Sequence, residues 1–239
     1  MQREKKLNRG KLKGYIFEVA IRILLRRNGW NLLNRPEPRR IKIGNKYDIE
    51  IKGRGTWHQI DSPCIFSRRI PFVYPLRLLV EAKYYTGVVD KSVIRSYIGV
   101  IKDISENYII DDTHTVNNQK RYTDIGAFFS AEGFHDEAVN LAFAHGIKTI
   151  SYKTNQLMHT IISGIKELEE KGLKARNTII AGKQARFMLD LESLIEDGND
   201  EEIDAFVTNY QGTRHATITL KALIHAIKNL GASFIGMTT

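Results

Sequence analysis

The sequence predicts an α/β protein in which helices flank a mixed central sheet, with a mainly helical extension after about residue 153. Three observations support this fold class. The almost continuous apolar run at 76–83 is typical of a strand that is buried on both faces. The strand–helix–strand pattern over 124–152 has short connections, which predicts a right-handed crossover between parallel strands. Beyond it, apolar residues recur at helical spacing.

The first part of the chain begins with a helix and continues with short strands. Apolar residues at helical spacing, followed by the stop signal Asn28-Gly29, predict the helix. Two runs on either side of Gly53-Arg54-Gly55 predict a pair of strands. In order, we expect a helix over 11–28, an extended connection over 30–40 that Pro36 and Pro38 interrupt, strands over 46–52 and 57–61, an irregular proline-containing segment over 62–75, and a strand over 76–83.

The second part alternates helices with strands and then becomes helical. One apolar stripe predicts the helix that follows the strand at 76–83, and Gly146 predicts the end of a later helix. In order, we expect a helix over 90–108, a polar loop over 109–122, a strand over 124–130, a helix over 133–145, a strand over 147–152, a helix over 155–171, an acidic stretch over 184–206, a helix over 217–229 and a short strand over 232–237.

Composition narrows the class of protein. A chain of 239 residues allows one large domain, or a core of about 150 residues with an appendage. The single cysteine, Cys64, excludes an intramolecular disulfide and a cysteine-based zinc site, and it favours a reducing compartment. No apolar run approaches the roughly 18 residues of a membrane span. Glu18 and Arg22 interrupt the first apolar stretch, so we expect no signal peptide and a cytoplasmic protein.

The positive charge is concentrated at the N-terminus. Residues 1–40 hold 12 Lys/Arg and 3 Asp/Glu, so the whole net charge of +9 lies there. Such a block favours a polyanionic partner, and nucleic acid is preferred here over a membrane surface. Residues 188–204 carry eight Asp/Glu and no Lys/Arg. That acidic stretch either shields the basic segment or is a solvated helix and loop.

Two charged residues, Glu81 and Lys83, close the apolar strand, and a lone acid, Asp61, lies twenty positions before Glu81. Glu81 and Lys83 project from the same face of the strand, about 7 Å apart. If Asp61 lies on a neighbouring strand, two carboxylates and an ammonium meet at one strand end. Two carboxylates suit a hard cation such as Mg²⁺, and an ammonium beside them can position water or stabilise charge on a phosphate. This combination predicts phosphodiester hydrolysis.

The order of these elements resembles the PD-(D/E)xK nuclease superfamily, which has the restriction-endonuclease-like fold. Over 11–152, about three fifths of the chain, it is most similar to Mrr-like restriction endonucleases. Ile60 stands where the motif usually has proline, and residues 153–239 match no family. The matching segments are Gly14-Tyr15-Ile16-Phe17-Glu18, His58-Gln59-Ile60-Asp61, Leu79-Val80-Glu81-Ala82-Lys83, and Ile125 to Ser130 with Gly133-Phe134 and Ala138 to Gly146.

The resemblance implies a role for each matching residue. Asp61 and Glu81 would ligate Mg²⁺, for which Mn²⁺ can substitute, with the carbonyl of Ala82 as a third ligand. Lys83 would hold the attacking water or the scissile phosphate. Glu18 would orient a water on the metal or a second ion; the alternative is an ion pair with Arg22 on the same helix.

The resemblance further implies a three-layer nuclease core with the basic segment over 1–152, and a mainly helical accessory region over 153–239. The expected function is a metal-dependent DNA endonuclease of restriction or phage defence. Two alternatives stay open: a DNA-binding module of the same fold without turnover, and a structure-specific nuclease of repair or recombination. DNA is the expected partner, with a homodimer as a way to cut both strands. The residues expected to contact phosphate are Lys5, Lys6, Arg9, Lys11 and Lys13.

Overall fold

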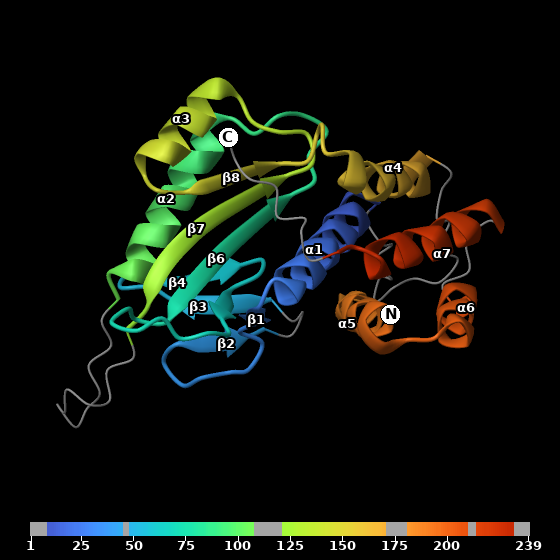
Figure 1. The fold of residues 1–239 in the computed structure, drawn as a ribbon, viewed down its shortest axis with the longest axis horizontal. Helices are drawn as coiled ribbons and strands as arrows, with labels where there is room; N and C mark the ends of the chain where they lie inside the picture. The colour runs from blue at the N-terminus through green and yellow to red at the C-terminus, as the bar shows by residue number, and fades with distance from the viewer. Residues whose placement is uncertain (1–8, 45–47, 108–120, 171–180, 210–213, 232–239) are drawn as a thin grey trace, which may run out of the picture. The chain divides into compact units, whose positions relative to one another are not determined.

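The computed structural model describes residues 9–44, 48–107, 121–170, 181–209 and 214–231 (Figure 1). The described chain forms two compact units. The first element, helix α1 (Arg9–Arg27), groups with the helices after residue 152, and residues 28–151 form the other unit, which contains the sheets. The expected boundary between a nuclease core and an accessory region, at 152/153, stays a prediction.

The main sheet of the strand-containing unit has five strands in the order β1-β5-β6-β7-β8. The long central strands β6 and β7 are parallel, as are β7 and β8, whereas β5 is antiparallel to both β1 and β6. The sheet is therefore mixed, as the sequence predicts. Its strands are β1 (Trp30–Leu32), β5 (Cys64–Phe66), β6 (Leu76–Lys83), β7 (Thr123–Ser130) and β8 (Lys148–Ser151).

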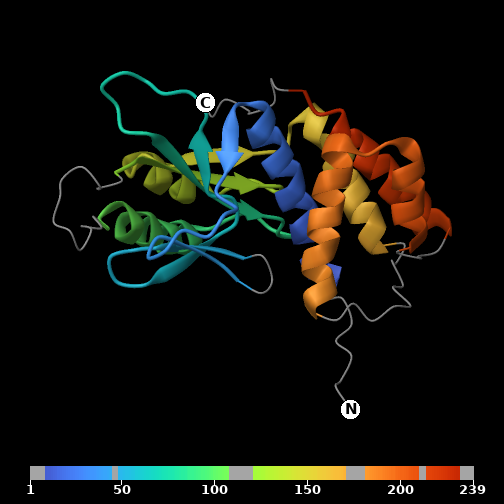
Figure 2. The ribbon, with the colours of Figure 1, turned by 90° about the horizontal axis from the view of Figure 1, so that it is seen from below.

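Helices α2 (Lys91–Ser105) and α3 (Asp136–Ala144) cover one face of this sheet (Figures 1 and 2). Ile94 and Tyr97 of α2 pack with Ala138 of α3 against Phe128 of β7. The apolar stripe that predicts α2 is thus the stripe that it buries. Helix α3 ends before Gly146, whose φ of 69° is a conformation that favours glycine.

A second, antiparallel sheet packs beside the first. It consists of β2 (Ile41–Ile43), β3 (Ile49–Lys52) and β4 (Trp57–Ile60), in the order β2-β3-β4. Its buried face contributes Ile51 and Ile60, which pack with Leu79 of β6 and Ile104 of α2. This shared core connects the end of β4 to the middle of β6, and it sets the course of the chain that follows Ile60.

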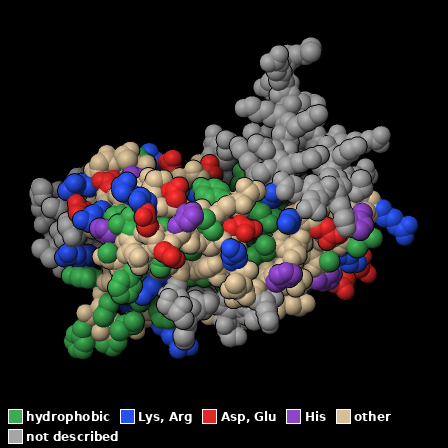
Figure 3. Space-filling view, turned by 90° about the horizontal axis from the view of Figure 1, so that it is seen from above, with side chains coloured by type: hydrophobic (Ala, Val, Ile, Leu, Met, Phe, Trp, Pro, Cys, Tyr) green, Lys and Arg blue, Asp and Glu red, His purple; other side chains and the backbone are tan. Residues whose placement is uncertain are grey.

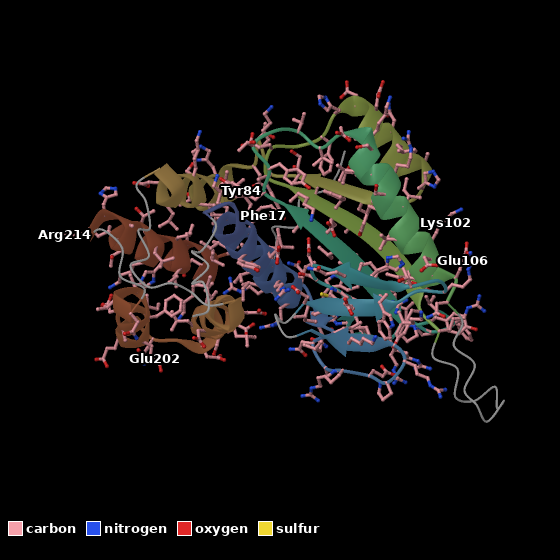
Figure 4. All side chains as sticks on the ribbon, turned by 180° about the vertical axis from the view of Figure 1, so that it is seen from behind. Phe17, Tyr84, Lys102, Glu106, Glu202 and Arg214 are labelled. Atoms are coloured by element: carbon pink, nitrogen blue, oxygen red, sulfur yellow. The ribbon has the colours of Figure 1, made fainter. Side chains whose placement is uncertain are left out.

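The turn between β3 and β4 is fastened to the end of α2. The Asp103 carboxylate accepts hydrogen bonds from the amides of Gly55 at 2.9 Å and Thr56 at 3.3 Å, and lies 2.7 Å from His58 Nε2. The hydrogen bond from His58, followed by those from the turn amides, lowers the pKa of Asp103 to about 2. Arg54 pairs with Glu106 at 3.0 Å, on the end of α2 that Figure 4 labels. His58 therefore helps to hold this turn against the end of α2.

The helical unit contains α1 and four helices that follow residue 152. Helix α1 packs against α4 and α5, and α4 packs against α7. Glu192 of α5 is 7% exposed and pairs with Arg26 at 2.7 Å and with Arg22 at 3.6 Å. Within the acidic stretch, Glu192 and Glu196 thus neutralise basic residues of α1. The helices are α4 (Gln156–Glu170), α5 (Ala181–Asp197), α6 (Asp200–Asn209) and α7 (Arg214–Lys228).

Most predicted elements are confirmed within one to three residues, and the strand at 76–83 is confirmed at both ends. The sequence does not predict β1, β2 or β5, because three-residue strands are too short to show alternation. The predicted strand over 232–237 lies outside the described residues. In the part of the chain that is described, no helix combines the length and the apolar character needed to cross a membrane.

Candidate active site

The candidate site is formed at the carboxyl end of β6. Side chains alternate along a strand, so Leu79, Glu81 and Lys83 share one face. Leu79 is fully buried, while the side chains of Glu81 and Lys83 are 20% and 25% exposed. The strand thus passes from the core to a partly open end. That is where an apolar strand can carry charges, provided they have partners.

Asp61 is brought to β6 by the chain that leaves β4. It lies directly after Ile60, at the point where the chain crosses from the second sheet to the main sheet. The amide of Ser62 donates to the carbonyl of Val80 at 3.3 Å, and the amide of Ala82 donates to Asp61 Oδ2 at 2.9 Å. These two hydrogen bonds, to Val80 and from Ala82 of β6, thus hold Asp61 beside that strand.

Lys83 lies between the two carboxylates. Its Nζ forms an ion pair with Glu81 and lies 3.6 Å from Asp61 Oδ2. The Asp61 side chain is only 10% exposed. The three residues that the sequence singles out are therefore brought together, although the strand that delivers Asp61 belongs to the second sheet.

The charges in this cluster perturb each other. Burial raises the pKa of Glu81 to about 7, and repulsion from Asp61 adds to this effect against the attraction of Lys83. Burial by itself would lower the pKa of Lys83, but the attraction of Asp61 and Glu81 outweighs it, so this pKa lies above its ordinary value. The ammonium of Lys83 is hence fully charged near neutral pH, whereas the carboxyl group of Glu81 is only partly ionised there.

The backbone adds an oxygen to the same site. The N–H of Ala82 points toward Asp61, and the carbonyl of Val80 points to the same side of the strand, where it meets Ser62. In a strand, the N–H and C=O of one residue point the same way, so the carbonyl of Ala82 also faces Asp61. Two carboxylates and one carbonyl are oxygen donors of the kind that Mg²⁺ and Mn²⁺ accept.

No cluster of three or more His, Cys, Asp or Glu side chains that could hold a metal ion occurs within the described ranges. A cation at β6 would therefore depend on Asp61, Glu81 and the Ala82 carbonyl, with waters or substrate oxygens completing its coordination. This agrees with the preference of Mg²⁺ for one or two carboxylates and retained waters. The donor set fits the cation that the sequence predicts.

Tyr97 of α2, which the sequence does not single out, stabilises the strand that carries the site. Tyr97 of α2 is buried, donates a hydrogen bond to the carbonyl of Leu79, and accepts one from the amide of Ala127 at 3.2 Å. Burial, with the nearby charge of Glu81, raises the pKa of this phenol well above its ordinary range. Tyr97 thus ties α2 to β6 and β7 two residues before Glu81. Its position in the apolar stripe of α2 gives no sign of this bond.

The other predicted site residues lie on α1, in the helical unit, or outside the described residues. Glu18 lies on α1, which belongs to the helical unit. Its expected alternative partner, Arg22, pairs with Glu192. Of the predicted phosphate-contacting residues, Lys5 and Lys6 lie outside the described residues, and Arg9 and Lys11 belong to α1. Lys13 is 8% exposed, which leaves its side chain little access to phosphate.

Comparisons with known proteins add little. No family model and no curated protein matches the chain. A crystal structure of a protein of unknown function, AF1548, aligns with 76% of this chain and 97% of its own, at 13% identity and a TM-score of 0.39. At this score the likeness carries no argument. What is established is the class: an α/β protein with a mixed five-stranded sheet flanked by helices, and a helical C-terminal part.

Proposed function

We propose that the protein is a metal-dependent endonuclease that hydrolyses DNA phosphodiester bonds, with Asp61, Glu81 and Lys83 as its active site. The observation that carries the proposal is the convergence of two partly buried carboxylates and a charged ammonium at one strand end. Perturbed ionisable groups that share a partner are typical of functional sites. The resemblance to PD-(D/E)xK nucleases supports the same assignment.

Each residue then has a defined task. Asp61, Glu81 and the Ala82 carbonyl would hold Mg²⁺ or Mn²⁺, which when bound polarises a phosphoryl oxygen and lowers the pKa of a coordinated water. Lys83 directs its ammonium at the scissile phosphate or the attacking water, where it stabilises negative charge in the transition state. Once a cation neutralises the carboxylates, Lys83 no longer has to serve as their counter-ion. Glu18 is proposed to orient the water.

The biological setting that we propose is cytoplasmic restriction or phage defence, with DNA bound partly through the basic residues of the first 40 positions. Phosphate contacts position a protein on DNA but carry no sequence information. A binding module of the same fold without turnover would bind a plasmid and leave it uncut.

The test is digestion of a supercoiled plasmid with Mg²⁺, with Mn²⁺ and with chelator. We expect nicked and linear products with either cation and none with chelator, because a closed circle has no end for an exonuclease. Asp61→Ala or Glu81→Ala should abolish cleavage and leave DNA binding near normal, since losing a carboxylate reduces repulsion of phosphate. Glu50→Gln, a half-exposed strand glutamate outside the site, is the matched control. Wild-type cleavage in either alanine variant would remove the assignment.

A further inference from the structure

The loop between β5 and β6 exposes hydrophobic side chains on a projection of the strand-containing unit. Residues 67–75 are all exposed, and in Figure 2 this segment leaves the sheet as an extended arm. Figure 3 shows hydrophobic side chains gathered on a projection at the lower left. Exposed hydrophobic groups of this kind mark interaction sites. The side chains are Ile70, Phe72, Val73 and Tyr74, which are 44%, 109%, 43% and 55% exposed.

A strained turn places Phe72 at the tip. The amide of Val73 donates to the carbonyl of Ile70 at 3.3 Å, which closes a four-residue turn with Pro71 and Phe72 at its centre. Phe72 has a φ of 64°, the conformation that a type II turn requires at this position and that glycine normally supplies. A bulky residue with positive φ is a genuine outlier. The chain thus keeps a fully exposed phenylalanine where glycine would form the turn with less strain.

Positive charge surrounds this aromatic tip. Arg68 and Arg69 precede it on the exposed loop, and no Asp or Glu occurs from residue 67 to 80. The guanidinium of Arg121 lies 5.4 Å from the ring centre of Tyr74. An aromatic side chain that basic residues flank is the arrangement by which proteins stack on bases and neutralise adjacent phosphates.

We propose that the loop over 67–75 is a DNA wedge, in which Phe72 stacks on a base exposed at an unpaired or distorted step while Arg68 and Arg69 contact the flanking phosphates. The inference rests on the proposed nuclease function and deepens it by naming DNA with unpaired bases as the favoured substrate. The loop joins β6 at Leu76, five residues before Glu81. At about 3.3 Å per residue, the distance along β6 from Leu76 to Glu81 is about 17 Å, which equals about five base steps along a DNA strand.

The test measures binding in chelator, so that it does not depend on cleavage. The probes are a fluorescent duplex and the same duplex with a mismatched bubble, titrated by anisotropy at fixed salt. Stacking of one base on an aromatic ring is worth about 1–3 kcal/mol, so Phe72→Ala should weaken bubble binding about 5- to 150-fold and paired-duplex binding much less. Phe143→Ala, which removes an 84%-exposed phenylalanine from α3, is the matched control and should change neither.

Two further variants separate a ligand contact from a structural role. Phe72→Gly relieves the positive φ, so it should keep or raise the melting temperature while it loses the preference for the bubble. Arg68→Gln with Arg69→Gln should weaken both probes and flatten the salt dependence, by about 0.9 per lost phosphate contact on duplex DNA. Arg95→Gln with Lys102→Gln, two exposed cations of α2, is the control for charge.

The outcomes distinguish this inference from the proposed function. If the wild-type protein cleaves plasmid but Phe72→Ala binds both probes normally, the wedge is wrong and the nuclease proposal stands. If the wild-type protein never cleaves but prefers the bubble, and Phe72→Ala loses that preference, the wedge is supported and the nuclease proposal is refuted. Binding to anionic lipid vesicles that Phe72→Ala abolishes, with DNA binding unchanged, would show that the loop is a membrane contact and overturn the inference.

Discussion

Replacing Glu81 by glutamine should make the protein more stable above neutral pH. Burial and the repulsion of Asp61 raise the pKa of Glu81 to about 7 in the folded protein, from 4.5 in an unfolded chain. A carboxyl group whose pKa is raised on folding stabilises the fold when protonated, below pH 4.5, and progressively loses that contribution as the pH rises toward 7. Glutamine resembles the protonated form and pays no such cost at any pH.

The size of the effect follows from the same two values. Each pH unit between them corresponds to about 1.4 kcal/mol, so ionisation of Glu81 costs the folded state about 3 kcal/mol once the pH has passed 7. The side chain is 20% exposed, so solvent screens this cost only in part. Lys83 keeps Asp61 as its partner at 3.6 Å in the variant. We expect a gain of about 2–3 kcal/mol, or roughly 5–10 °C in melting temperature.

The assay is thermal unfolding of wild type, Glu81→Gln and the control Glu50→Gln from pH 4 to pH 9 in chelator. The advantage of Glu81→Gln should be absent near pH 4, grow between pH 4.5 and 7, and then level off. Addition of Mg²⁺ or Mn²⁺ at pH 8 should stabilise the wild type and the control but not Glu81→Gln. A Glu81→Gln variant that melts at or below the wild-type temperature at pH 8 in chelator would refute the reasoning.

Two further predictions concern the charges that act on the substrate. Lys83→Met keeps much of the stem volume but removes the ammonium, so single-turnover cleavage with Mg²⁺ should slow by about 10²–10³ with near-normal DNA affinity. If the wild type does not cleave at all and Lys83→Met loses DNA affinity, the result would instead support the binding module. Glutamine at the basic N-terminal positions should flatten the plot of log affinity against log salt by about 0.9 for each lost phosphate contact. An unchanged slope would place the DNA elsewhere, and a variant that retains the buried Lys13 tests whether the other four suffice. The positions to change are Lys5, Lys6, Arg9, Lys11 and Lys13.

The strand that carries the site could be predicted because it satisfies two independent constraints. An apolar run of this length requires burial on both faces, and charges at its end require partners. Those two conditions determine β6 and the shared face of Glu81 and Lys83. The partner Asp61 is less certain from sequence alone, because a lone acid after a short strand is usually a turn residue. Its place beside β6 depends on the packing of Ile60 with Leu79, which is a tertiary contact.

The features that the sequence does not reveal depend on tertiary contacts. The fastening of the β3–β4 turn needs Asp103, which lies 45 positions from His58 and has no local signature. The link of Tyr97 to Leu79 likewise joins a helix to a strand through a side chain that reads as core. Glu192 lies in an acidic stretch of the sequence, and only the packing of α5 against α1 brings it to its partner Arg26. Local patterns determine the elements, whereas these bonds follow only from how the elements pack.

The composition of the cluster at β6 argues for a cation site rather than an internal salt bridge. One carboxylate would be enough to pair Lys83, and a second partly buried carboxylate adds repulsion that raises the pKa of Glu81. Without a cation this repulsion destabilises the fold, and pKa shifts that come from burial and a like charge are common at functional sites. A divalent cation would remove the repulsion, and it would leave the ammonium of Lys83 available for a phosphate. The destabilisation of the metal-free protein and the proposed affinity for the cation therefore have the same origin, and Glu81→Gln should abolish both together.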